Sequence, residues 1–151
     1  MSEITNIVDQ LERAFEGNAW HGPALTELLA GVSAQQAAAR PLSGAHTIWE
    51  LVRHIIHWEK VVCERLKGVR VDTPEQGDWT QVDDVSPEAW QKTLSSLREA
   101  HQTLSGLTAA LPEASLERMA AGMDYTVYFM LHGVIQHNLY HGGQIALLKQ
   151  A

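Results

Sequence analysis

Two histidines stand four residues apart in the stretch HNLYH, which covers residues 137 to 141. Residues at that spacing lie on adjacent turns of one face of an α-helix, with Cβ atoms about 5–6 Å apart. Two neutral imidazoles placed in this way can share one metal ion. Chance and core hydrogen bonding also produce this spacing, so His137 and His141 alone do not define a metal site.

A third ligand is expected from the segment TIWELVRHIIHWEKVVCERLKG, residues 47 to 68. At about 100° per residue, His54 lies roughly 90° from the centre of its apolar stripe and His57 roughly 150°. The spacing therefore favours His54 as the third ligand and predicts that His57 faces solvent or a loop. Trp58, one turn after His54, is expected to close one side of the pocket. Each unpaired inward ring would cost about 1–3 kcal/mol, and one divalent cation would satisfy all three.

The chemistry of such a site follows from what surrounds the histidines. The pair is not HExxH, so the glutamate that acts as general base in zincin proteases is missing. Three neutral imidazoles leave the cation its full charge and an open position, which suits activation of water or binding of a thiolate. Glu50 and Tyr140 are candidate helpers, Gln144 is a candidate to orient His141, and His21 could border a pocket.

Four other residues raise expectations of their own. Gly142 and Gly143 cost about 1 kcal/mol each relative to alanine inside a helix. Close approach of another helix or subunit, or room for a ligand, would explain them. His101 lies among surface-type residues and is expected to be solvated, and Cys63 is expected to be a small buried side chain or an idle thiol.

The elements that must position these residues are predicted to be helices. Apolar residues recur at three- and four-residue spacing, and no stretch sustains the two-residue alternation of a strand. Long helices are expected over residues 4–17, 47–68, 86–111 and from 124 almost to the end. With a short accessory helix at 33–40 and a long loop at 69–85, the pattern predicts an all-α four-helix bundle in one domain, 1–151.

Composition excludes several classes of function. The 151 residues are 45% hydrophobic and 19% charged, an ordinary globular balance. The formal net charge of −7 and the lack of a basic run argue against nucleic-acid binding. No stretch reaches about 18 apolar residues, and charges interrupt the N-terminus, so neither a membrane span nor a signal peptide is predicted. One cysteine cannot form an internal disulfide, which fits the cytoplasm.

The two histidine blocks together resemble a known family. The blocks read GAHTIWELVRHIIHWE and, far downstream, HNLYHGGQIALL. They are similar to the DinB-like superfamily, which includes the bacillithiol- and mycothiol-dependent transferases, and AWHGPALTELLAGVSAQQAAARP resembles the N-terminal stretch of many members. The resemblance implies a four-helix bundle, often dimeric, with a divalent metal held by three histidines. Those ligands fall on His54, His137 and His141.

These expectations lead to one main hypothesis and two alternatives. The main one is a cytoplasmic, homodimeric enzyme with one divalent metal ion (Zn, Ni, Fe or Mn), either a hydrolase or a low-molecular-weight-thiol S-transferase on a small molecule. Its specificity would come from the 69–85 loop and the pocket walls. One alternative is a non-catalytic metal-binding stress-response module. The other is a helical dimer in which the histidines bond only to one another.

Overall fold

The computed structural model describes residues 2–151, and this part of the chain is helical with connecting loops. The described residues contain no strand, only an isolated bridge between Met119 and Thr126. The all-α prediction is therefore confirmed. The long helices are α1 (Glu3–Glu16), α4 (Ile48–Leu66), α5 (Pro87–Ala109) and α6 (Val127–Leu148). The shorter ones are α2 (Leu25–Leu29), α3 (Ala34–Ala38) and the 3-10 helix η1 (Glu113–Glu117).

Capping residues begin the two helices that carry the histidines. The Thr47 side chain accepts a hydrogen bond from the Glu50 backbone N–H, and the Glu50 carboxylate accepts one from the Thr47 N–H at 2.8 Å. Thr126 caps α6 by accepting from the Phe129 N–H, so α6 begins three residues later than the sequence indicated. These caps satisfy backbone donors that a helix otherwise leaves free, and they set where α4 and α6 start.

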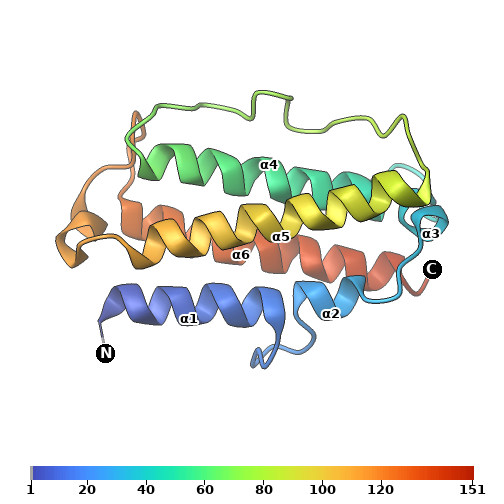
Figure 1. Ribbon diagram of the computed structural model, residues 1–151, viewed down its shortest axis with the longest axis horizontal. Helices are drawn as coiled ribbons and strands as arrows, with labels where there is room; N and C mark the ends of the chain where they lie inside the picture. Colours follow the sequence, from blue (N-terminus) through green and yellow to red (C-terminus); the bar gives the residue numbers. More distant parts are fainter. Residues whose placement is uncertain (1) are drawn as a thin grey trace.

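The four long helices lie alongside one another, and the chain between α4 and α5 runs along the outside of α4 (Figure 1). Helix α4 packs against α5 and α6, and α1 packs against the same two helices. No helix interrupts residues 69–85, as predicted. The loop reaches α4 at His54, whose Nδ1 lies 2.8 Å from the Asp78 carbonyl oxygen.

The apolar core has two parts. One surrounds Trp49 and Trp90, whose indole N–H groups donate to Thr93 Oγ1 at 2.9 Å and to the Val32 carbonyl at 2.8 Å. The other surrounds Leu131. The apolar residues on the face of α6 that carries His137 and His141 are all buried: Val127, Met130, Val134, Ile145 and Leu148.

A polar layer separates the two parts of the core. Glu59 of α4 is fully buried, and its Oε1 accepts a hydrogen bond from Asn138 Nδ2 of α6 at 2.8 Å. The predicted solvation of His101 is wrong, because this side chain is 2% exposed and stacks on Phe15 with centroids 3.8 Å apart. His101 follows Leu97 by one turn and precedes Leu104 by another, both buried, so the apolar stripe of α5 carries it inward.

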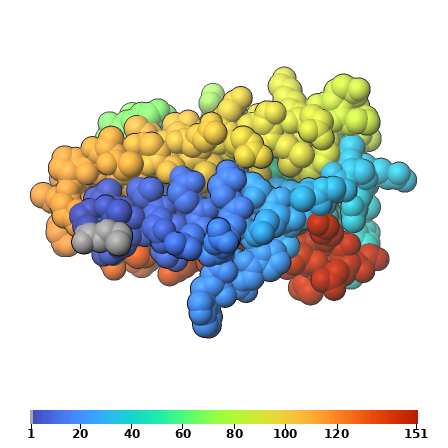
Figure 2. Space-filling model, turned by 60° about the horizontal axis from the view of Figure 1, so that its bottom comes forward, coloured from blue at the N-terminus to red at the C-terminus, as the bar shows by residue number. Residues whose placement is uncertain are grey.

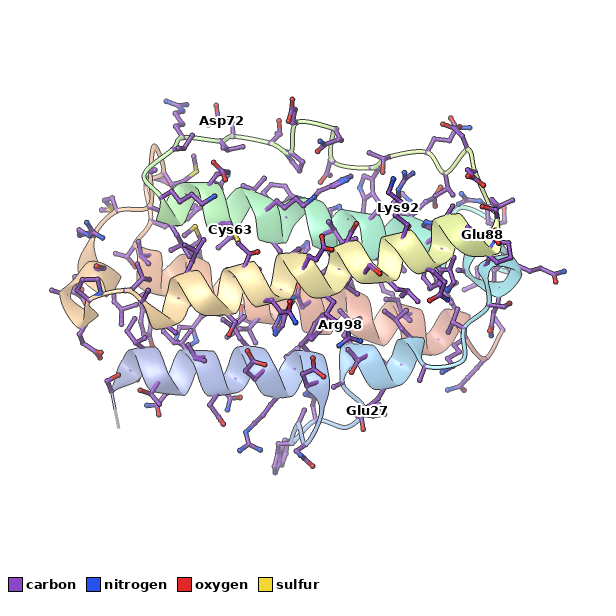
Figure 3. All side chains as sticks on the ribbon, viewed as in Figure 1. Glu27, Cys63, Asp72, Glu88, Lys92 and Arg98 are labelled. Atoms are coloured by element: carbon purple, nitrogen blue, oxygen red, sulfur yellow. The ribbon has the colours of Figure 1, made fainter. Side chains whose placement is uncertain are left out.

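Cys63, labelled on α4 in Figure 3, is buried. Of the two expectations for this residue, the structure agrees with a small buried side chain. Burial raises the pKa of its thiol to about 11. The thiol therefore stays protonated at neutral pH and is a poor nucleophile.

Candidate metal site

Helices α4 and α6 bring the three predicted histidines together. One ring nitrogen of each lies within 4.8 Å of those of the other two. The Nε2 atoms of His54 and His137 are 3.0 Å apart, and the ring centroids of His137 and His141 are 4.5 Å apart. Zinc–nitrogen bonds of 2.0–2.1 Å in a tetrahedral site place neighbouring nitrogens about 3.3 Å apart, so the spacing suits a shared cation.

Hydrogen bonds determine which nitrogen of two rings is free. His54 Nδ1–H donates to the backbone carbonyl of Asp78 at 2.8 Å, and a carbonyl can only accept. His141 Nδ1–H donates to Gln144 Oε1 at 2.7 Å. Both rings therefore keep a lone pair on Nε2. Gln144 lies beside His141, as the sequence suggested for a residue that orients a ligand.

The third ring, His137, is held neutral by its surroundings. Burial, with smaller contributions from the rings of His141 and His54, lowers the pKa of His137 from 6.5 to about 4. Burial likewise lowers the pKa of His141. At neutral pH the three rings can therefore offer lone pairs together, a donor set that suits Zn, Ni or Fe.

A pH dependence of the metal-free protein follows from these rings. The unfolded chain takes up a proton at His137 near pH 6.5, whereas the folded chain resists it down to about pH 4. Stability is therefore fully present above about pH 6.5 and is lost as the pH falls toward about 4. We expect the unfolding temperature of chelator-treated protein to fall across this window, and less steeply in His137→Gln. A flat or rising temperature toward acid would contradict this.

The loop between α4 and α5 covers one side of the site. Trp79 stacks on His54 with ring centroids 4.0 Å apart, and His46 stacks on Trp79 at 3.5 Å. Trp58 Nε1–H donates to Asp78 Oδ1 at 2.8 Å, which ties the loop to α4. Asp78, Trp79 and His46 were not predicted, because no helical spacing connects a loop to the histidines. The sequence signal for this contact was Trp79, the one aromatic residue of the 69–85 loop.

The remaining candidate residues lie outside the triad. Glu50 accepts from Arg40 at 2.8 Å as well as capping α4. Burial opposes its ionisation, but the Thr47 N–H and Arg40 outweigh that and lower the pKa of its carboxyl. Tyr140 is 67% exposed, with its ring centroid 5.1 Å from that of His141. His57 is half-buried and lines a surface cleft together with Arg53 of α4 and Asp84 of the loop after α4. This position agrees with the expectation that His57 faces solvent or a loop.

His21 does border a cavity, on the other side of α6. This cleft of about 600 Å³ is also lined by Gly142 and Gly143. A Cβ on Gly142 would meet only Leu28 at an ordinary 3.6 Å, and one on Gly143 would meet nothing within 4 Å. Close approach of another helix within the chain therefore does not explain the glycines. Figure 2 shows the segment after α1, which contains the fully exposed Trp20, projecting from this face.

Within residues 2–151, every helix is too short or too polar to cross a membrane.

Comparison with known proteins places the chain in a family. No curated protein and no solved structure matches the chain significantly. The family model described as the DinB superfamily matches residues 19–145, which include all three histidines and the loop that covers them. Because this match spans most of the sequence, the chain belongs to the DinB superfamily.

Proposed function

We propose that the chain is a divalent-metal-dependent enzyme that hydrolyses a small molecule or transfers a low-molecular-weight thiol to an electrophile. The observation that carries the proposal is the convergence of three imidazoles, two of which have their Nε2 lone pairs set by hydrogen bonds to Asp78 and Gln144. A plain polar core would not need this arrangement. The proposed ligands are His54, His137 and His141.

The residues around the histidines have distinct parts in this proposal. A bound divalent cation would supply Lewis-acid chemistry, lowering the pKa of a coordinated water or thiol. The Asp78 carbonyl and Gln144 hold two rings in the ligating tautomer. Trp79, stacked on His54, limits access of water from the loop side. Three protein ligands leave room for a substrate, whereas a structural site is normally closed by four.

Two assays test the proposal on the whole chain. Chelator-treated protein is reconstituted with Zn, Ni, Fe or Mn and assayed for hydrolysis of small esters and amides, and for transfer of cysteine to 1-chloro-2,4-dinitrobenzene. The proposal predicts a rate that requires metal and is absent in His137→Ala. Metal binding without any metal-dependent rate would favour the non-catalytic module instead.

Gln144→Ala is expected to weaken metal binding without removing a ligand. The His141 Nδ1–H loses its acceptor, so the ring is no longer held in the ligating orientation. Loss of such an outer partner typically lowers metal affinity by about 10–100-fold. Zinc titration against a competing chelator measures this. Gln150→Ala serves as the control, and equal affinities in the two variants would show that Gln144 does not orient His141.

The homodimer and the cytoplasmic location stay predictions. Tyr140, Gly143 and Leu147 share one exposed face of α6, a helix without a single Asp, Glu, Lys or Arg between residues 127 and 148. An uncharged, partly apolar face of this kind suits burial against a second copy. Sedimentation velocity over a range of protein concentrations checks the expected dimer.

A further inference from the structure

A second cavity, between α4 and α6, adjoins the histidine site. It has a volume of about 210 Å³, and its walls include His137 and Trp58 as well as Arg65 and Tyr125. Apolar side chains line the rest of the cavity: Val62, Phe129, Met130 and Val134. Ligand pockets for drug-sized molecules usually exceed about 300 Å³, so this cavity suits a smaller molecule.

Arg65 brings to this cavity a charge that has a cation–π contact with the Trp58 ring, 5.8 Å from Cζ to the centroid, but no carboxylate partner among the described residues. The side chain is 6% exposed, and within residues 2–151 no carboxylate oxygen lies within 4.0 Å of its guanidinium. The nearby Asp72 side chain contacts Arg70 Nε at 3.1 Å, and Figure 3 shows it on the outer edge of the loop. Buried charges are normally paired, because an isolated one is costly to remove from water. A counterion is therefore expected.

The hydrogen bonds of Arg65 leave donors that point to an anion. Nε and Nη2 donate to the Val71 carbonyl at 2.9 and 2.6 Å, Nη2 also donates to the Asp72 carbonyl at 3.3 Å, and Nη1 donates to Tyr125 Oη at 2.8 Å. A guanidinium has five N–H groups, so one on Nη1 has no acceptor among the described residues. Tyr125 Oη accepts from Arg65, and its own O–H is also without an acceptor among them.

We propose that this cavity binds a small molecule with a carboxylate on an apolar chain or ring. The carboxylate oxygens accept from the remaining Arg65 Nη1–H and the Tyr125 O–H, and the apolar part packs against Trp58, Phe129 and Val134. The end that reacts lies at the histidines, because His137 forms part of the same cavity. That last step rests on the proposed function, whereas binding of the carboxylate does not.

A purely structural reading of Arg65 makes a different prediction. The hydrogen bonds from Arg65 to the Val71 and Asp72 carbonyls hold the turn after α4 in place. This structural role of Arg65 needs no ligand. If Arg65 did only this, carboxylates would bind no better than neutral molecules of the same shape.

Binding of matched probes to metal-free protein tests the proposal. Butyrate, phenylacetate and 3-phenylpropionate are each compared with the corresponding amide by calorimetry. At least one carboxylate is expected to bind about tenfold or more tightly than its amide, since a charge-assisted hydrogen bond is stronger than one between neutral groups. Tyr125→Phe, which keeps the charge and the turn, and Arg65→Gln should both reduce this preference. No preference for any carboxylate, or a preference unchanged in both variants, overturns the proposal.

Two glycines of α6 give a matched pair of variants. Gly133 lines this cavity and Gly143 lines the cleft on the other side, and a Cβ on either would meet nothing within 4 Å. Gly133→Leu should fill the cavity and abolish carboxylate binding, whereas Gly143→Leu should leave it unchanged. Equal binding by both variants would show that the carboxylate binds elsewhere.

Metal uptake, measured after reconstitution of the same preparations with Zn, Ni, Fe or Mn, separates the two proposals. Carboxylate binding that depends on Arg65 in a protein that takes up no metal would leave the pocket established and the metal-dependent function rejected. Normal metal uptake with no preference for carboxylates would reject the pocket alone.

Discussion

His137→Ala is expected to lower the affinity for zinc by more than about a hundredfold. Loss of a residue that only hydrogen-bonds to a ligand typically lowers metal affinity by about 10–100-fold, and loss of a ligand itself should cost more. The three rings form a triangle, in which His137 Nε2 lies 3.0 Å from that of His54 and the His137 centroid lies 4.5 Å from that of His141. Removing it leaves two imidazoles, too few to close a stable site. Titration of metal-free protein with zinc in the presence of a competing chelator measures the change.

His132→Ala is the matched control for this prediction. His132 is on the same helix, five residues earlier, and its Nε2 lies 3.6 Å from Glu3 Oε1 rather than near the triad. Its loss should leave zinc affinity unchanged. If both variants bound zinc like the wild type, the assignment of His137 as a ligand would fail.

Asn138→Ala is expected to destabilise the metal-free protein by about 1–3 kcal/mol, the cost of leaving a buried polar group without its hydrogen bond. Among residues 2–151, Asn138 Nδ2 provides the only hydrogen bond to the fully buried carboxyl group of Glu59, and Glu59 Oε2 has none. The nearest cationic candidate, His101, has its Nδ1 3.7 Å from Glu59 Oε1, beyond hydrogen-bond distance. Urea unfolding of chelator-treated protein measures the effect, and Gln136→Ala, on the exposed face of α6, should change stability little.

A double variant separates the lost hydrogen bond from a lost packing contact. Replacing Glu59 with leucine removes the buried carboxyl group that accepts this hydrogen bond, so Asn138→Ala should cost much less in a Glu59→Leu background. The same loss of stability in both backgrounds would show that Asn138 stabilises the fold by packing and not through Glu59.

Helical spacing was enough to predict the residues that helices position. The phase of α4 favoured His54 over His57, and the structure places His54 beside His137 and His141. The apolar residues of α6 that share a face with His137 and His141 are buried, as the three- and four-residue spacing of apolar residues implies. Each of these conclusions needs only the rotation of about 100° per residue and one consistent apolar face.

Contacts made by loops and by buried polar groups could not be predicted in this way. Asp78 and Trp79 reach His54 from a segment without regular spacing. His101 continues the apolar stripe of α5 among mostly polar neighbours, and the packing of α5 against α1 and α4 shows that this part of the stripe is buried. The sequence likewise does not show that Arg65 lacks a carboxylate partner, because this requires the positions of all carboxylates.

Elemental analysis of untagged protein, purified without chelators, tests the central claim most directly. Wild type is compared with a His54→Ala, His137→Ala double variant after reconstitution of both with Zn, Ni, Mn and Fe. We predict about one metal ion per chain in the wild type and a loss of that metal in the double variant, as expected for one three-histidine site. Wild type without metal, or a double variant that keeps it, would contradict the account.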